Sequence, residues 1–240
     1  MLEMKPERAN ITDYEAQPIS VGGKTLVADM SGALWWPAES TLIIADLHLE
    51  KGSSYAARGQ FVPPYDTRET LSRLAVLIDR WDPRRIIALG DSFHDERAAD
   101  RIDAGDREAL RILQEGREWI WVTGNHDPHI CALLGGTVVD RIILGGLKLQ
   151  HAPFDGEATH EIAAHLHPAA RLSIYGHTLR RPCFVGNGRR LILPAFGTFT
   201  GGLNVLDAAF APLFGHDGMR VWMLGQEGVY PVATRHLVGE

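Results

Sequence analysis

The stretch Thr41-Leu42-Ile43-Ile44-Ala45-Asp46-Leu47-His48 decides how the first half of this sequence is expected to fold. Its first five residues form a short apolar, β-branched run typical of a buried strand, and two side chains that can bind a metal follow. The run Arg85-Ile86-Ile87-Ala88-Leu89-Gly90 has the same form and leads to Asp91. A third run, residues 119–124, leads to Asn125, His126 and Asp127. Because α/β folds place their sites at the carboxyl ends of strands, these side chains are expected to meet at one sheet edge.

Helical patterns lie between these strands. The segment Asp66-Thr67-Arg68-Glu69 has the spacing of an N-cap with a carboxylate three residues later, and apolar residues then recur at helical spacing as far as Trp81. A second helix is predicted for residues 106–115. Strand, helix, strand, helix and strand over residues 41–122 indicate two crossover units in a parallel or mixed sheet. The predicted strands are residues 25–28, 41–45, 85–89, 118–122 and 148–150.

The second half of the sequence has a different pattern. After residue 135, pairs of glycines separate short apolar runs, and helical periodicity is weak except around residues 157–165. We therefore expect this half to be rich in β-structure. Two halves that close one sheet-on-sheet core are the simplest architecture, and residues 1–240 are predicted to form a single domain.

Composition limits the classes of protein that fit. The sequence has 24 Lys and Arg against 30 Asp and Glu, a formal net charge of -6, and 45% hydrophobic residues. These values are typical of a globular chain and exclude a wholly basic surface, so binding of nucleic acid would need a local patch. The only cysteines, Cys131 and Cys183, predict a reducing compartment, and with no export signal visible we expect a cytoplasmic protein. The charge-poor residues 191–216 are broken by proline and glycine, so no membrane span is predicted.

Two further predicted strand ends carry histidines. Residues 147–150 precede His151, and residues 162–164 precede His165 and His167. The i, i+2 spacing of Asp46 and His48, like that of His165 and His167, points alternate side chains of an extended segment the same way. Each residue alone has an ordinary explanation, such as a helix cap for Asp91 or a surface or core position for His151. Their order along the chain, each at a strand end, favours a metal site.

This ordered set of D-x-H, G-D, G-N-H-D, a lone His and H-x-H resembles the calcineurin-like metallophosphoesterases over residues 41–168. The resemblance implies an α/β (α+β) fold in which a two-sheet β-sandwich is flanked by helices in four αββα layers. It also implies two divalent metal ions bridged by Asp91. One ion would be held by Asp46, His48, Asp91 and His167. The other would be held by Asp91, Asn125, His151 and His165. Imidazole and oxygen ligands without thiolate suit manganese, which we expect, and also iron or zinc.

The resemblance also implies a mechanism of phosphate ester hydrolysis. Two bound cations would supply an activated water for attack on phosphorus and would neutralise the developing charge. His126 would assist the leaving group by donating a proton, while Asp127 would orient the His126 imidazole and favour its protonated form. The alternative for Asp127 is a turn residue before Pro128.

One motif departs from the family pattern. Its last histidine pair is preceded by Gly in the family, whereas Ala164 precedes His165 here. The segment Gly176-His177 does have the glycine but supplies one imidazole at most. We therefore expect His165 and His167 to be the ligands, with His177 as the alternative.

Several stretches resemble a narrower group, the bacterial ligase-associated DNA damage response endonucleases. They are residues 45–52, 58–59 with 63–67, 165–172, and 194–197 with 200–202. This resemblance implies a phosphodiesterase or endonuclease that acts on nucleic acid, with DNA as the expected substrate. It also implies a role in DNA repair, in functional association with a DNA ligase, a helicase and an exonuclease. We expect Lys51, Arg58 and His94 to contact substrate. Other basic residues that could meet a phosphate backbone are Arg97, Arg101, Arg180-Arg181 and Arg189-Arg190.

Two other functions remain open at this point. A small-molecule phosphoesterase that hydrolyses nucleotides, cyclic nucleotides or phosphomonoesters would use the same metals but a closed pocket, where a nuclease would have a long basic groove. A catalytically inactive scaffold would have eroded ligand positions, and none of the ligand positions in this sequence is eroded.

Overall fold

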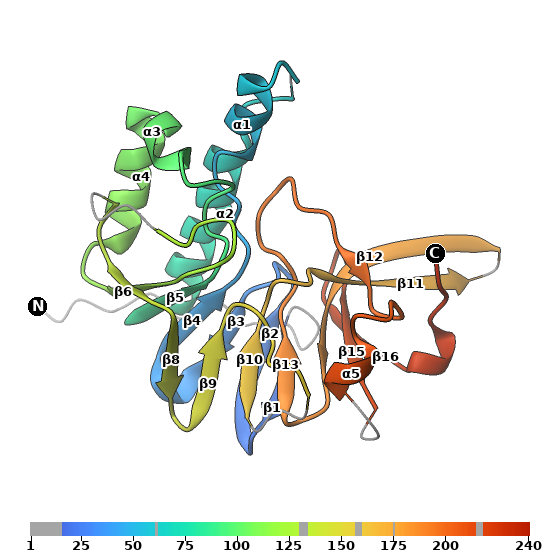
Figure 1. The fold of residues 1–240 in the computed structure, drawn as a ribbon. Coiled ribbons are helices and arrows are strands. Elements are labelled where there is room, and N and C mark those ends of the chain that lie inside the picture. The colour runs from blue at the N-terminus through green and yellow to red at the C-terminus, as the bar shows by residue number, and fades with distance from the viewer. Residues whose placement is uncertain (1–15, 61, 130–133, 157–159, 175, 215–217) are drawn as a thin grey trace, which may run out of the picture.

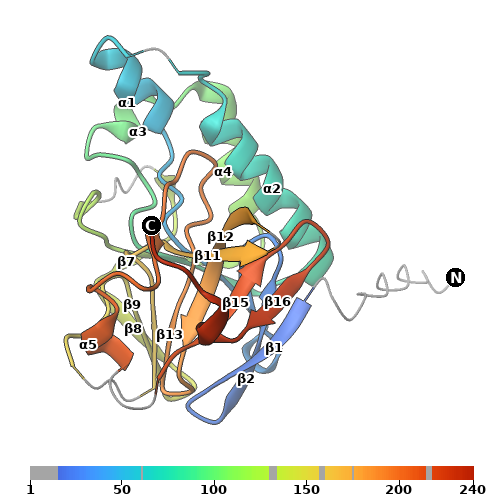
Figure 2. The ribbon, with the colours of Figure 1, turned by 90° about the vertical axis from the view of Figure 1, so that its right-hand side faces the viewer.

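Two β-sheets pack face to face, and helices lie against their outer faces (Figure 1, Figure 2). The computed structural model describes residues 16–60, 62–129, 134–156, 160–174, 176–214 and 218–240. None of the helices in this described part is both long and apolar enough to span a lipid bilayer.

The first sheet has seven strands in the order β1-β2-β3-β4-β5-β6-β7. They are β1 (Ala16–Val21), β2 (Lys24–Asp29), β3 (Leu34–Trp36), β4 (Thr41–Ile44), β5 (Arg85–Leu89), β6 (Glu118–Val122) and β7 (Thr137–Val139). Neighbours from β1 to β4 are antiparallel, and those from β4 to β7 are parallel. The predicted mixed sheet is confirmed, and the carboxyl ends of β4, β5 and β6 share one edge.

Four helices accompany the first sheet. They are α1 (Lys51–Ala57), α2 (Asp66–Trp81), α3 (Ala98–Arg101) and α4 (Ala104–Gln114), and a 3₁₀ turn covers Pro37–Glu39. Helices α2 and α4 match the two helices predicted from the sequence. The predicted cap of α2 is wrong, because Asp66 lies inside the helix and its Oδ2 accepts a hydrogen bond from the Gly52 N–H at 3.1 Å. A contact with α1 has replaced the local cap.

The second sheet has nine strands. They are β8 (Arg141–Leu144), β9 (Leu147–Gln150), β10 (Glu161–Ala163), β11 (Pro168–Ile174), β12 (His177–Gly186), β13 (Arg190–Ile192), β14 (Leu203–Asn204), β15 (Arg220–Leu224) and β16 (Val229–Val232). Among the described residues, this half of the chain also contains helix α5 (Ala211–Phe214) and a 3₁₀ turn at Thr234–His236. The second half is β-rich as predicted, but the helical periodicity near residues 157–165 was misleading. Residues 161–163 form strand β10, which pairs with β9 and β13, and residues 157–159 lie outside the described part.

Three apolar layers hold the sandwich together. Alternate side chains of β4 point to opposite faces of the sheet. Ile43 lies between the two sheets, in one cluster with residues such as Leu149 and Phe184, whereas Leu42 and Ile44 pack toward α2. The outer face of the second sheet packs on a cluster that includes Phe210 and Phe214 of the α5 region. Helix, sheet, sheet and helix layers therefore follow one another, as the predicted αββα arrangement requires.

Candidate metal centre

The candidate ligands come together where the two sheets present adjacent strand ends. Asp46 and His48 follow β4, Asp91 follows β5, Asn125 follows β6, His151 follows β9, and His165 and His167 follow β10. Backbone hydrogen bonds fix the loops to one another: the His48 N–H donates to Asp91 O at 2.9 Å, and the Ala164 N–H donates to His151 O at 2.8 Å. Strand ends of both sheets thus contribute to one site.

Asp46, His48 and His167 form the first group of convergent ligand atoms. His167 Nε2 lies 3.2 Å from Asp46 Oδ1 and 3.3 Å from His48 Nε2. Asp91 Oδ2 lies 4.0 Å from His48 Nε2. The Asp46 side chain is fully buried, and although His167 Nε2 is near, Oδ1 accepts no hydrogen bond from the described residues. Because an unpaired buried carboxylate oxygen is costly, this arrangement fits a bound cation.

Asp91, His151 and His165 form the second group. His151 Nε2 lies 3.4 Å from Asp91 Oδ2, 3.1 Å from His165 Nδ1 and 3.1 Å from Asn125 Oδ1. The other ring nitrogen of His151 faces Leu89 O at 3.3 Å, which leaves Nε2 to face the site. Oxygen and imidazole nitrogen atoms therefore converge, and Asp91 Oδ2 borders both groups. The donor set fits two divalent cations that share one carboxylate.

The protonation of the histidines is consistent with a ligand role. Burial lowers the pKa of His48 to about 3, and the charge of His167 acts in the same direction, so the His48 ring is neutral. Burial also opposes the charged form of His151, but the hydrogen bond to Asp91 and the charges of Asp46 and Asp91 raise its pKa overall. A cation between these groups would take the place of the proton that the two carboxylates favour on His151.

The backbone at the ligands is unusual. Asp46, His48, Asp91, His165 and His167 all have positive φ angles, between 43° and 72°. Residues other than glycine rarely adopt this region, and such conformations gather at functional sites, where the surrounding structure holds them in place. The turns also correct our argument from spacing. Asp46-x-His48 and His165-x-His167 are not extended segments, and His165 and His167 reach different groups of the centre.

The glycines of the two central motifs make room for the ligands. A Cβ atom on Gly90 would overlap the ring of His151, and one on Gly124 would overlap Asp91 Oδ1. Gly90 also has a φ of +78°. These positions bring the backbone of one motif against the side chain of another, so glycine is required there for steric reasons.

His126 lies on the open side of the centre. Its Nδ1 faces His94 O at 3.0 Å, and its backbone N–H donates to Asp91 Oδ1 at 2.9 Å. The side chain is 43% exposed, and Nε2 lies 3.9 Å from Asp91 Oδ2. A donor hydrogen on Nδ1 bonded to His94 O leaves Nε2 as the atom that can exchange a proton with a substrate.

Asp127 does not orient the His126 ring as we expected. Its two carboxylate oxygens accept hydrogen bonds from the backbone N–H groups of Gly124 at 2.9 Å and Phe93 at 3.0 Å. Burial raises the pKa of Asp127 to about 6, even though these hydrogen bonds act against the shift. The structure therefore corrects the expected contact: Asp127 ties the loop after β6 to the loop after β5, and His94 O is the partner of the His126 ring.

Comparison with solved structures agrees with this arrangement. No protein-family model and no curated protein sequence matches the chain. A nuclease named MPE from Pseudomonas putida is 31% identical, with a TM-score of 0.70 over 90% of this chain and 100% of that chain. This chain belongs to the calcineurin-like metallophosphoesterase family. A phosphoesterase from E. coli, Yfce, also matches at 14% identity and a TM-score of 0.39, over 83% of this chain and 96% of that one.

Of the predicted substrate-contacting residues of this metallophosphoesterase, Lys51 and His94 lie in a cluster of rings beside His126. The His94 ring stacks on His126 with centroids 5.6 Å apart and meets Tyr55 edge-on at 5.7 Å. Lys51 begins α1, and burial lowers its pKa. Arg58 follows α1 and is exposed. Burial lowers the pKa of His94, and the positive charges of Lys51 and Arg58 act in the same direction. Lys51 Nζ lies 6.0 Å from the centre of the Tyr55 ring, so Lys51 is close to His94.

Sequence reasoning missed the residues that hold α1 of the metallophosphoesterase beside its metal centre. Glu50, with a φ of 65°, accepts hydrogen bonds from the Thr67 hydroxyl at 2.9 Å and the Ser53 hydroxyl at 2.6 Å. A Cβ atom on Gly52 would come within 2.5 Å of Asp66 Oδ1. These contacts join two stretches that carry the endonuclease resemblance, residues 45–52 and 63–67. That shared resemblance was the available signal, since no local pattern relates Glu50 to Thr67.

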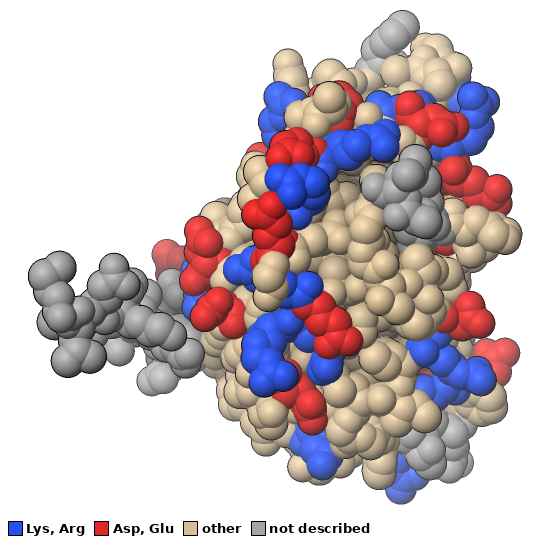
Figure 3. Space-filling view, turned by 90° about the vertical axis from the view of Figure 1, so that its left-hand side faces the viewer, with Lys and Arg blue, Asp and Glu red and all other residues tan. Residues whose placement is uncertain are grey.

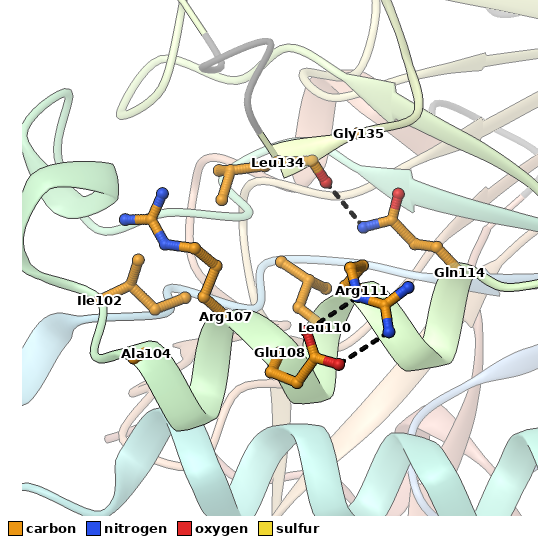
Figure 4. Close-up of a pocket in the computed structure, with 9 residues that line it drawn as sticks. All are labelled: Ile102, Ala104, Arg107, Glu108, Leu110, Arg111, Gln114, Leu134 and Gly135. Atoms are coloured by element: carbon orange, nitrogen blue, oxygen red, sulfur yellow. Dashed lines mark hydrogen bonds and ion pairs between the residues drawn. The ribbon is translucent and has the colours of Figure 1, made fainter.

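A hollow of about 470 Å³ elsewhere on the metallophosphoesterase is not part of this centre (Figure 4). It lies along α4, near Leu134 and Gly135. Its polar side chains bond within the protein: Arg111 pairs with Glu108 at 2.7 Å, and Gln114 donates to Leu134 O at 2.8 Å. The hollow is therefore a packing groove between α4 and a loop, and these polar groups are already paired.

Proposed function

We propose that this metallophosphoesterase is a nuclease that hydrolyses phosphodiester bonds in DNA and acts in DNA repair. The reaction would use two divalent cations, for which manganese is the expected metal. The similarity to the Pseudomonas putida nuclease over nearly the whole chain supports cleavage of nucleic acid. The sequence resemblance to the ligase-associated endonucleases supports the repair role and the association with a DNA ligase, a helicase and an exonuclease.

Asp46, His48, Asp91 and His167 would hold one cation, and Asp91, Asn125, His151 and His165 the other. Bound cations would supply an activated water at neutral pH and would neutralise charge that develops on the phosphoryl oxygens. His126 would donate a proton from Nε2 to the departing oxygen, while the hydrogen bond between Nδ1 and His94 O holds the ring in position.

The exposed rim of the candidate metal centre supports a polymeric substrate. Asp46, His48, Asp91 and His151 are buried and form its floor. Asn125, His126 and His165 are exposed and form its rim. Sites for small molecules usually bury roughly 70–90% of the ligand surface. An open rim of this kind instead suits one bond of a longer strand, which extends beyond the centre on both sides.

We expect hydrolysis by this protein to depend on metal and to prefer diesters. The Mn²⁺-loaded protein should hydrolyse bis(p-nitrophenyl) phosphate and cleave supercoiled plasmid, with little turnover of p-nitrophenyl phosphate. Chelation should abolish both activities, and Mn²⁺ should restore them, because imidazole and oxygen ligands without thiolate suit this ion. Full activity after chelation would contradict the metal role. Hydrolysis of the monoester alone, with intact plasmid, would favour the small-molecule phosphoesterase.

Replacing His126 with alanine should separate metal binding from proton transfer. We expect both metals to remain and turnover of DNA to fall by about 10²–10⁴-fold, the usual contribution of general acid catalysis. The loss should be much smaller for bis(p-nitrophenyl) phosphate, since a nitrophenolate leaving group needs little protonation. Metal analysis and steady-state kinetics on both substrates measure this difference.

The His129→Ala variant is the matched control for this substitution. His129 is an exposed histidine in the same loop, and its replacement should leave both activities near those of the wild type. Loss of a metal ion in His126→Ala would make His126 a ligand and would overturn the role we assign to it.

A further inference from the structure

A cavity of about 170 Å³ opens directly beside the candidate metal centre. His167 forms part of its wall, and Arg180 and Arg181 of β12 line it together with Thr200, Gly201 and Gly202. The proposed hydrolysis assigns no role to the two arginines or to this loop. The cavity therefore adds two guanidinium groups next to a residue that we assign to a cation.

The fold fixes the arginines relative to His167. Strand β11 begins immediately after His167 and pairs with β12, so that Ala170 lies opposite Arg181 and Arg171 lies opposite Arg180. On the other side, the Leu203 N–H donates to His167 O at 3.1 Å. His167 thus sits between β12 and the loop at residues 200–202, and the cavity cannot move away from the centre without breaking these contacts.

The charge of the residues that line this cavity differs from that of the surface over α3 and α4. Over the α3–α4 side, positive and negative side chains are interspersed (Figure 3), and the residues that line the α4 groove include Glu108. Among the described residues, those that line the cavity include neither Asp nor Glu. Arg180 Nη2 donates to Gly202 O, which orients its guanidinium toward the loop. A guanidinium fork of this kind matches the oxygens of a phosphate group.

One carboxylate already contacts Arg180 from outside. Glu240 Oε1 lies 3.2 Å from Arg180 Nε, and the Glu240 side chain is 65% exposed. Exposed ion pairs contribute little to stability, so an incoming phosphate can displace this carboxylate. The contact indicates that Arg180 is accessible to an anion.

The glycine loop leaves space for a backbone to approach. A Cβ atom on Gly201 would meet nothing within 4 Å, so this residue faces open space. The Thr200 hydroxyl donates to Gly197 O at 2.7 Å, and the Gly197 N–H donates to Asp46 O at 3.2 Å. The loop is therefore anchored to the segment of Asp46 and remains open at its tip.

We propose that this cavity binds a phosphate group of the nucleic-acid strand that neighbours the bond to be cleaved, with Arg180 and Arg181 as its ligands. This inference rests on the proposed nuclease function. A nucleic-acid strand that extends from the metal centre over His167 would place its next phosphates beside the arginines. A simple diester has no second phosphate to occupy the cavity. Binding by the two arginines would therefore favour a polymer over a small ester.

Binding of a dye-labelled single-stranded oligonucleotide tests this proposal. Stopped-flow fluorescence anisotropy with the Mn²⁺-loaded protein reads binding before cleavage. We expect the Arg180→Gln, Arg181→Gln double variant to bind at least about tenfold more weakly, as the removal of charged hydrogen bonds implies. The slope of log affinity against log salt should fall by about 0.7 for each phosphate that the variant no longer neutralises. Glu240→Gln should bind more tightly, since it removes the competing carboxylate.

The control is Arg141→Gln, which removes one positive charge from the exposed surface of β8 and does not line the cavity; it should bind like the wild type. Metal content and melting temperature verify that each variant is folded. If the double variant does not fold, Arg180→Lys, Arg181→Lys keeps both charges but lacks the planar fork, and it should still bind more weakly than the wild type.

The outcomes separate the two proposals. If the wild type binds and cleaves the oligonucleotide but the arginine variants bind with unchanged affinity and salt dependence, the cavity has no such role and the nuclease function stands. If the wild type hydrolyses bis(p-nitrophenyl) phosphate but neither binds nor cleaves the oligonucleotide, the nuclease function and the cavity proposal are both overturned.

Discussion

Replacing Asp91 with asparagine should remove most of the bound metal and lower diester hydrolysis by at least about 10³-fold. Its Oδ2 lies 3.4 Å from His151 Nε2 and 4.0 Å from His48 Nε2, so this one oxygen borders both groups of ligands. Oδ1 accepts the backbone N–H of His126 at 2.9 Å. The negative charge of Asp91 would offset the repulsion between two cations. Asparagine keeps the size of the side chain but removes this charge.

Elemental analysis and turnover of bis(p-nitrophenyl) phosphate measure this effect. The control is Asp100→Asn, which neutralises a carboxylate on α3 away from the ligand groups and should retain both metals and full activity. An Asp91→Asn variant that is folded and still binds two metals would show that Asp91 does not bridge, and the ligand assignment would have to be revised.

The sequence alone predicted that the candidate metal centre lies at the carboxyl ends of the strands of the first sheet, because short apolar strands are local features. The strand predictions at residues 85–89 and 118–122 coincide with β5 and β6. Once these strands pair in parallel with β4, their carboxyl ends must meet, and the residues that follow them are brought together. The placement of Asp46, Asp91 and Asn125 therefore followed from order along the chain alone.

Local rules failed where a tertiary contact was stronger. Asp66 resembles a helix cap by spacing, but its carboxylate accepts from Gly52 of α1 instead. Asp127 was expected beside the neighbouring His126 ring, but two backbone N–H groups hold it in the interior. In both cases a buried carboxylate accepts a hydrogen bond from a distant segment, at Gly52 or at Phe93, and a single sequence carries no signal for such a pair.

The cavity beside His167 also depends on distant segments. Arg180 and Arg181 were notable in the sequence only as basic residues. The antiparallel pairing of β11 with β12 brings them back to His167, and the loop at residues 200–202 closes the cavity from a third segment. Without this topology, the two arginines could not be distinguished from solvated surface residues such as Arg141, which is exposed on β8.

The histidine pair after β10 gives the second large effect. We expect His165→Ala and His167→Ala each to reduce bound metal from two ions toward one and to abolish hydrolysis, because each removes one coordinating imidazole. His165 Nδ1 faces His151 Nε2 at 3.1 Å, whereas His167 Nε2 faces Asp46 Oδ1 at 3.2 Å. The two variants should therefore lose different ions, which spectroscopy of the Mn²⁺ that remains can distinguish.

His177→Ala is the control that decides between the two histidine motifs. His177 has the preceding glycine that the family motif would favour, but it is exposed at the start of β12 and belongs to none of the convergent ligand groups of the described residues. Loss of a surface imidazole should change stability by no more than about 0.5 kcal/mol and leave metal content at the wild-type level. If His177→Ala loses a metal while His165→Ala retains both, the ligand lies at Gly176-His177, and the turn that places His165 beside His151 has no role in binding metal.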